Sequence, residues 1–438
     1  MGSYGSITTQ SENAMKKSNA LPKPSLLGLL PSFGFGDRLG LATPGHIAAC
    51  QKGKLQPIFA QQSVREMTRT QRTPQEVMAA AQCGIQQEKW KGTWGADADH
   101  LKTREDVENL ASAGFTFFTI DPSAYVQNEA DHLKGAELQA AAEKVVRSGA
   151  FKSLSEVESL YLNKSHSLPD SGKLGFTNKE ALYRAVVKYG KAVAHSEKMA
   201  QWIEKAAKDN GAEIEVSVDE TDTPTSAAEH LFIGLELKRR NVNPVSVAPR
   251  FIGEFEKGID YRGNLKAFET SLHQHVAIAK YCGPYKISVH SGSDKFSIYP
   301  IIGRVCGNLL HVKTAGTSYL EALRVVARQA PALFLEIILY SRSRFEADRA
   351  TYHISAVLSK IKSPEALQPS EREKIYLDDN GGRQVLHVTF GSVLTLGKTA
   401  RGRSFKEGVL ETLHTNESLH REVLAAHLGK HIRLLGAG

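Results

Sequence analysis

The chain has 438 residues, of which 41% are hydrophobic and 23% are charged, and these proportions are those of a soluble globular protein rather than a disordered one. Neither an apolar leader nor an apolar run of membrane-spanning length occurs, so the sequence predicts a cytoplasmic protein without a membrane partner. The formal charge of +8 is spread along the chain, which argues against nucleic acid as a partner and favours small anionic substrates.

The four cysteines stand far apart and form no C-x-x-C pair, which favours reduced thiols over a disulfide frame or a zinc cluster. The first residues, 1–25, are polar and lack periodicity, and we expect a flexible tail there. Residues 26–438 are then expected to form one catalytic domain. Its oligomeric state is left open by the sequence, and a homo-oligomer is compatible with it.

A short apolar strand, a polar strand end and a helical stretch recur along this domain. The expected strands lie within residues 38–46, 56–64, 115–126, 213–225, 243–253, 286–292, 309–317 and 385–394. Eight strands that alternate with helices predict an α/β fold, a (β/α)8 TIM-like barrel. Residues 127–180 are expected to be an inserted helical segment over the barrel mouth, and residues 396–438 a C-terminal helical cap.

Alternation along the strands predicts which side chains face the barrel interior. In "EVSVDE", Val216 and Val218 share the outer face, so Asp219 points inward and Glu220 follows at the rim. The same argument places His290 inside "KISVHSG" and Lys313 inside "LLHVKTAG".

Two further strand ends complete this set. The alternation in "VLHVTFG" places His387 inside, and Asp121 ends the strand in "FTIDPS". Catalytic groups of such barrels gather at the carboxyl ends of the strands, so we expect all these residues to converge there.

Mixed carboxylate and imidazole ligands are typical of divalent metals such as Zn, Mn, Co or Ni. Asp219, Glu220 and His290 are the predicted metal ligands, and His387 is a weaker fourth candidate. Both His290 and His387 are also compatible with hydrogen-bonded core histidines.

The long strand-end blocks also carry a resemblance to a known family. They are "FGFGDRLGLATPGHI" (33–47), "VSVDETDTPTSAAEH" (216–230), "VAPRFIGEFEKGIDYRGNL" (247–265), "KISVHSGSDKFSIYPIIG" (286–303), "HVKTAGTSYLEALR" (311–324) and "LHVTFGSVLT" (386–395). Together they resemble the bacterial tagaturonate epimerases, over most of the chain from about residue 30 onward. The resemblance implies a metal-dependent enzyme of hexuronate catabolism that interconverts tagaturonate and fructuronate.

These two sugar acids differ at the carbon β to the ketone, where a proton is not acidic. Three routes are open: retro-aldol cleavage and re-addition through a metal-stabilised enediolate, transient oxidation by a nicotinamide, or a double enolisation. The sequence has no dinucleotide fingerprint, which weakens the second route. A metal that holds the ketone favours the first.

Under this hypothesis Asp121 and Lys313 are the candidate acid/base residues, with the pKa of the lysine lowered toward neutrality by neighbouring cations. Arg38, Arg250 and Lys295 are expected to bind the uronate carboxylate. Asp37, Ser291 and Thr314 complete the predicted substrate-binding set.

Alternative functions remain open from the sequence. The nearest is a lyase or isomerase that acts on another sugar acid, and release of a three-carbon aldehyde would separate a lyase from an epimerase. A (β/α)8 glycoside hydrolase is disfavoured because few aromatic residues stand at strand ends. A sugar-acid sensor would need a partner surface that the sequence does not reveal.

Overall fold

Eight parallel strands close into a barrel in the computed structural model, which describes residues 21–51 and 53–436. The expected tail, 1–25, therefore lies mostly outside the described residues. Around the barrel the strands follow the order β1-β10-β9-β8-β7-β4-β3-β2. Their bounds are β1 Ser32–Gly36, β2 Gln56–Ser63, β3 Gly95–Leu101, β4 Phe117–Ile120, β7 Glu213–Val218, β8 Ser246–Pro249, β9 Lys286–Val289 and β10 Leu310–Thr314. The predicted (β/α)8 fold is thus confirmed.

Helices surround the barrel, and several of them begin where the sequence supplies a capping group. Thr73, Thr103 and Ser226 each accept a hydrogen bond from the backbone of the third helical residue and so fix a helix start. The outer helices are α2 Thr43–Cys50, α3 Val64–Thr70, α4 Pro74–Gln87, α5 Arg104–Ser112, α8 Lys179–Ala206, α9 Ala227–Arg239, α10 Leu265–Cys282, α11 Tyr299–Cys306, α12 Thr317–Gln329 and α18 Glu417–Leu435. No helix among the described residues has the length and apolar character needed to cross a bilayer.

Six of the eight predicted strand segments contain a barrel strand, and two do not. Residues 38–46 form a loop and the start of α2. The barrel strand in this part of the chain is β1, which ends before them at Gly36. Residues 385–394 are helical, in α15 Asn380–Val388 and α16 Phe390–Thr395. A short apolar run buried on every side reads the same in a helix and in a strand, and periodicity cannot separate the two.

Two barrel strands were not predicted. One is β1, which lies just before the expected segment 38–46, and the other is β3, with the sequence "GADADHL". It lacks the β-branched and aromatic residues that usually mark strands. Its alanines pack on the outer helices, whereas Asp97 and Asp99 point into the barrel and are buried.

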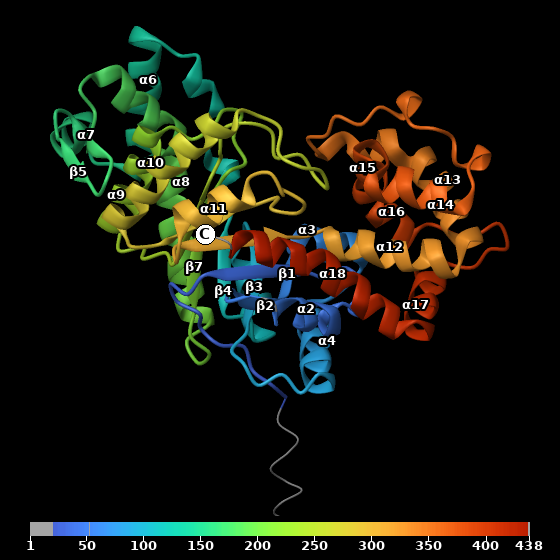
Figure 1. The fold of residues 1–438 in the computed structure, drawn as a ribbon. Helices are drawn as coiled ribbons and strands as arrows, with labels where there is room; N and C mark the ends of the chain where they lie inside the picture. Colours follow the sequence, from blue (N-terminus) through green and yellow to red (C-terminus); the bar gives the residue numbers. More distant parts are fainter. Residues whose placement is uncertain (1–20, 52, 437–438) are drawn as a thin grey trace, which may run out of the picture.

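Two groups of helices stand above the carboxyl ends of the strands, at the upper left and right of Figure 1. The left group includes the segment 127–180, with α6 Gly135–Val145, α7 Leu154–Tyr161 and a small hairpin of β5 His166–Leu168 and β6 Gly172–Leu174. It packs on α8, α9 and α10, for example through the hydrogen bond from Tyr161 to Glu236 and the contact between His166 and Tyr281.

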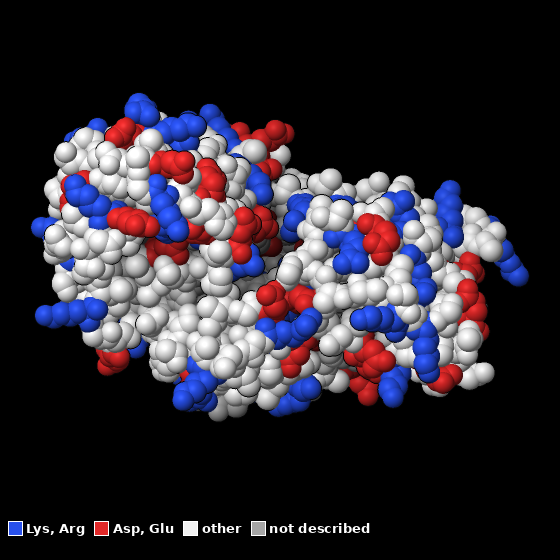
Figure 2. Space-filling view, turned by 90° about the horizontal axis from the view of Figure 1, so that it is seen from above, with Lys and Arg blue, Asp and Glu red and all other residues white. Residues whose placement is uncertain are grey.

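The right group, called here the helical lobe, comprises residues 331–415 between α12 and α18. Its helices are α13 Pro331–Asp348, α14 Pro369–Glu373, α15, α16 and α17 Phe405–Thr415. From above, the surface is hollowed between the two groups, and both acidic and basic residues surround this hollow (Figure 2). α18 then returns to pack beside α2, α11 and α12 and completes the outer helical layer.

A buried charged cluster joins the lobe to the barrel. Asp294, in the loop after β9, lies 2.8 Å from Arg383 of α15 and 2.6 Å from His427 of α18. His427 also lies 3.4 Å from Glu321 of α12. His431 uses its Nε2 to accept the Asp294 amide and its Nδ1 to contact the His427 carbonyl, so both ring nitrogens are occupied. This cluster therefore serves as a structural junction between three helices and a barrel loop.

Protonation of His427 is expected to stabilise this junction. Burial alone would lower the pKa of His427, but Glu321 and Asp294 outweigh it and raise the pKa above 6.5. The stabilisation should be complete below pH 6.5 and be lost as the pH rises through the raised pKa. His427→Gln should therefore cost about 1–3 kcal/mol of unfolding free energy at acidic pH and less at alkaline pH. Urea unfolding at several pH values tests this, and an equal cost at every pH would contradict it.

Candidate active site

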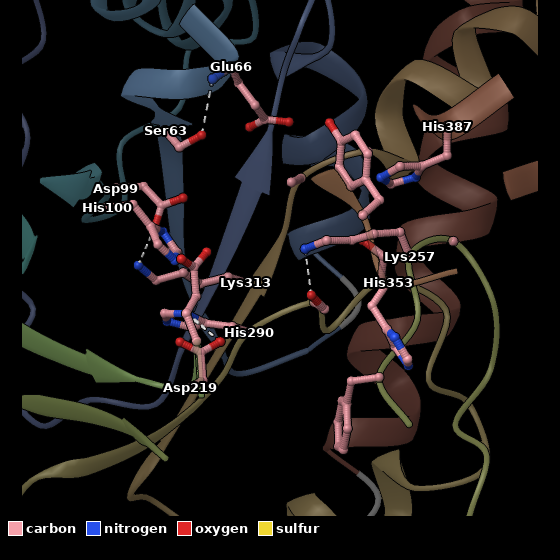
Figure 3. A pocket seen from close by; sticks show the side chains of 18 of the residues that line it. Ser63, Glu66, Asp99, His100, Asp219, Lys257, His290, Lys313, His353 and His387 are labelled. Atoms are coloured by element: carbon pink, nitrogen blue, oxygen red, sulfur yellow. Dashed lines mark hydrogen bonds and ion pairs between the residues drawn. The ribbon is translucent and has the colours of Figure 1, made fainter. Parts of the chain in front are cut away.

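A cavity of about 270 Å³ opens at the carboxyl ends of the barrel strands. Strand-end residues line its inner part, and the β8–α10 loop (residues 250–264) and the helical lobe line its outer part (Figure 3). Within the described residues, neither 127–180 nor 396–436 contributes a lining side chain. The lobe supplies Thr351, Tyr352, His353 and His387 instead.

Lys313 stands at the base of this cavity among three buried carboxylates. Its Nζ lies 2.7 Å from Asp97 Oδ2, 2.8 Å from Asp99 Oδ1 and 2.8 Å from Glu215 Oε1. It also donates to Thr119 Oγ1 at 2.5 Å. Burial alone would lower the pKa of Lys313, but the carboxylates raise it well above its usual value. The expectation of a lowered lysine pKa is therefore wrong, because the neighbours of Lys313 are anions.

The three carboxylates respond differently to this crowding. Burial raises the pKa of Asp97 to about 7, although Lys313 opposes the shift. The pKa values of Asp99 and Glu215 lie well below their usual range, because histidine and lysine cations overcome the effect of burial. Asp97 is thus the carboxyl at the barrel base that most readily takes up a proton.

His290 lies between two carboxylates, as Figure 3 shows for Asp219. Its Nε2 is 2.8 Å from Glu215 Oε1, and its buried Nδ1 makes no hydrogen bond but lies 3.3 Å from Asp219 Oδ2. Burial opposes the charged imidazole, yet Asp219 and Glu215 raise the pKa of His290 to about 10. The inward orientation predicted for Asp219 and His290 brings their side chains together.

His100 completes this group from the end of β3. Its Nδ1 lies 2.7 Å from Asp99 Oδ1, and its ring centroid is 5.0 Å from that of His290. The backbone of His100 adopts φ of 58°, a conformation that is uncommon for residues other than glycine and is often found at functional sites. His100, Asp219 and His290 offer ligand atoms that lie within 4.8 Å of one another.

Basic groups occupy the opposite side of the cavity. Lys257 donates a 2.6 Å hydrogen bond to Ser291, and burial followed by the charge of Arg65 lowers the pKa of Lys257. Arg65 and Arg250 also line the cavity, and neither forms an ion pair with another described residue. Figure 3 places Lys257 and His387 across from His100, Asp219 and His290.

His387 does not lie with the metal-ligand group, contrary to the sequence expectation. It belongs to α15 of the lobe and packs against Gly316, where a Cβ would approach the ring to 2.1 Å. Burial and the charge of Arg38 keep the pKa of His387 well below its usual value, so the imidazole is neutral. Its Nδ1 has no hydrogen-bond partner in the described part of the chain.

Some of the other predicted residues are already bound to protein groups. Arg38 lines the cavity but lies 2.6 Å from Glu66 and stacks on Phe390 at 3.6 Å. Asp37 accepts three backbone amides at the start of the following turn. Lys295 donates to three backbone carbonyls and does not line the cavity.

The remaining predicted residues divide between the cavity and its surroundings. Thr314 donates to the carbonyl of Gly34, and Asp121 lies 3.1 Å from Lys102. Neither residue lines the cavity. Glu220, Arg250 and Ser291 do line the cavity.

Sequence reasoning missed several residues that converge here, and those in two strands carried a detectable signal. Glu215 precedes Ser217 and Asp219 on the same strand face, so the alternation argument extends to it. The alternating acids of "GADADHL" mark an inward polar face, although the segment has weak strand propensity. Arg65 lies in the first turn of α3, directly after β2, and Lys257 lies in the β8–α10 loop, so strand alternation does not reach either residue.

Comparison with known proteins assigns the chain to a family. The model of the tagaturonate epimerase family matches residues 3–435. The chain belongs to the tagaturonate epimerase family. It is an isomerase of the epimerase type.

Two family members are particularly similar to the chain. The tagaturonate/fructuronate epimerase of Thermotoga maritima is 45% identical over 413 residues, which cover 94% of this chain and 82% of that protein. The native crystal structure of the fructuronate-tagaturonate epimerase UxaE from Cohnella laeviribosi superimposes with a TM-score of 0.88 at 37% identity, over 94% of this chain and 83% of that chain. A structure of the same enzyme with two glycerol molecules gives a TM-score of 0.89, over 97% of this chain and 86% of that chain.

Lys313 should be indispensable for the stability of this family member's barrel. Lys313→Met leaves three buried carboxylates without their shared cation, and the expected cost is about 3–5 kcal/mol of unfolding free energy. Adding Asp97→Asn should recover part of the loss, because it removes one of the unpaired carboxylates. Urea unfolding measures both changes, with the exposed Lys173→Met as the control. A loss no larger than that of the control would contradict the prediction.

Proposed function

We propose that this enzyme interconverts tagaturonate and fructuronate by metal-dependent retro-aldol cleavage and re-addition. The proposal rests on the arrangement of charged side chains in one cavity, in a chain of the tagaturonate epimerase family. A cluster of two imidazoles and a carboxylate lies on one side, and basic groups without carboxylate partners lie on the other. The cluster of imidazoles and carboxylate suits a divalent metal, and the basic groups suit an anionic sugar.

The donor set supports a metal site at His100, Asp219 and His290. Two imidazole nitrogens and a carboxylate oxygen are a common ligand set for Zn and related ions, and the buried Nδ1 of His290 lacks a hydrogen bond. His100 thus takes the place that the sequence analysis gave to His387. A bound divalent ion would polarise the substrate ketone and stabilise the negative charge that develops when the neighbouring bond breaks.

Side chains of the cavity account for the proton transfer and for the support of the metal ligands. Cleavage requires a base to take the proton from the hydroxyl on C4, the carbon β to the ketone. Glu220 follows the ligand Asp219 and lines the cavity, whereas Asp121 lies outside the lining and Lys313 keeps its proton. We therefore assign the first proton transfer to Glu220. Lys313 holds the carboxylates of the barrel base, and through Glu215 it orients His290.

Arg250 and Arg65 are the proposed partners of the uronate carboxylate. Arg38 is neutralised by Glu66, and Lys295 is bound to backbone carbonyls, so neither is available for an anion. Guanidinium groups bind carboxylates in a planar, bidentate geometry.

Metal retention should depend on the three proposed ligands. Chelator-treated wild-type protein should regain about one divalent ion per chain and its epimerase activity when Mn, Co, Ni or Zn is restored, whereas His290→Ala and His100→Ala should regain neither. Metal analysis and NMR detection of tagaturonate formed from fructuronate measure the two properties. His414→Ala, an exposed histidine of α17, is the control. A His290→Ala protein with full metal content and activity would reject the ligand assignment.

The carboxylate role of Arg250 can be tested by comparing substrates. Arg250→Gln removes charge-assisted hydrogen bonds and should raise the KM for tagaturonate about 10- to 100-fold, with a much smaller effect on a neutral ketohexose such as tagatose. Steady-state kinetics on both sugars give the comparison, and the exposed Arg104→Gln serves as the control. An equal rise for both sugars would exclude carboxylate recognition by Arg250.

A further inference from the structure

We propose that Lys257 is a second catalytic acid/base, which exchanges a proton with the C4 oxygen on the side of the substrate opposite Glu220. This role rests on the proposed epimerase function. It concerns a residue of the β8–α10 loop that no strand pattern indicated.

Inversion at one carbon creates the need for two such groups. In the first half of the reaction, Glu220 takes the hydroxyl proton, the C3–C4 bond breaks, and its electron pair remains on the ketone-bearing fragment while C4 becomes an aldehyde. The aldehyde then presents its other face, and C3 forms a new bond to C4. The C4 oxygen now points to the opposite side and takes a proton from the Lys257 ammonium. Exchange with water returns a proton to Lys257 and removes one from Glu220.

The surroundings of Lys257 leave it free for this task. Among the described residues its Nζ has one hydrogen-bond partner, the Ser291 hydroxyl at 2.6 Å, and no carboxylate within ion-pair distance. An ammonium carries three donors, so two remain for a ligand in the cavity that Lys257 lines. Figure 3 shows its side chain across the cavity from Asp219 and His290.

The residues on both sides of Lys257 are held by hydrogen bonds. Before it, the carboxylate of Glu256 accepts the Ser355 amide and the Gln384 side chain, each at 2.7 Å. After it, the carbonyl of Gly258 accepts a 2.8 Å hydrogen bond from Arg383 of the lobe.

Lys295 adds a further attachment beneath the same loop. Its buried ammonium donates to the carbonyls of Glu256 and Ile259 at 2.9 and 2.5 Å, and to that of Ser293 at 3.0 Å. The loop that carries Lys257 is therefore fixed both to the lobe and to the loop after β9. A catalytic group needs such preorganisation, whereas a solvent-exposed lysine does not.

The charges around Lys257 are consistent with proton exchange. Burial and the nearby Arg65 lower the pKa of Lys257, while Asp219, Glu66 and Glu220 oppose that shift. The competing role is simple attraction of the uronate carboxylate, for which any cation would serve.

Lys257→Arg and Lys257→Met separate these roles. Arginine keeps the positive charge but does not give up its proton, and methionine has neither the charge nor a proton to give. Both variants should therefore lose about 10²–10⁴-fold in kcat, and the KM should stay near the wild-type value. Lys280→Arg and Lys280→Met, on the exposed face of α10, should keep wild-type kinetics. Recovery of most of the kcat in Lys257→Arg would show that only the charge matters and would overturn the proposal.

Trapping of the cleaved fragment gives a readout that a structural role would not change. Metal-loaded Lys257→Met should still cleave the one epimer whose C4 hydroxyl faces Glu220, so phenylhydrazine should trap the three-carbon aldehyde acid from that epimer and not from the other. If the wild type is active and Lys257→Met gives equal trapping from both epimers, the role of Lys257 is overturned while the proposed epimerase function stands. A wild type that forms neither the epimer nor the fragment would overturn the proposed function as well. Equal metal content and thermal unfolding of variant and wild type establish that the fold is retained.

Discussion

The ammonium of Lys313 holds together the part of the barrel on which the site is built. Asp97, Asp99 and Glu215 come from β3 and β7, and each places a carboxylate near the same nitrogen. Three anions in a buried space would repel one another strongly without this cation. Because Glu215 also contacts His290 and Asp99 contacts His100, the same charge orients two of the proposed metal ligands indirectly.

The helical lobe has a different role, since it lines the part of the cavity that lies beyond the strand ends. It contributes His387 directly and fixes the β8–α10 loop through contacts of Gln384 and Arg383. The buried cluster around Asp294 ties this lobe to α12 and α18. The two sides of the cavity therefore come from separate parts of the chain, and their relative position depends on buried polar contacts and apolar helix packing rather than on strand pairing.

Strand alternation was a sound guide on three of the strands that were recognised. For β7, β9 and β10 it placed Asp219, His290 and Lys313 inward, because successive side chains of a strand point to opposite faces. The same argument failed for His387, since its apolar segment folds as a helix. It also missed His100, because the alanines and aspartates of β3 have low strand propensity.

The sequence by itself determined the class of fold, the family and the inward direction of three site residues. These properties depend on local periodicity and on long blocks of similar residues, both of which a single chain displays. Only the tertiary structure decided which charges meet. It gave Lys313 three anionic neighbours, paired Arg38 with Glu66, engaged Lys295 with carbonyl groups and left Lys257 facing the cavity. The physical reason is that the proton affinity and availability of a side chain depend on groups within a few ångströms, and those groups are distant in the sequence.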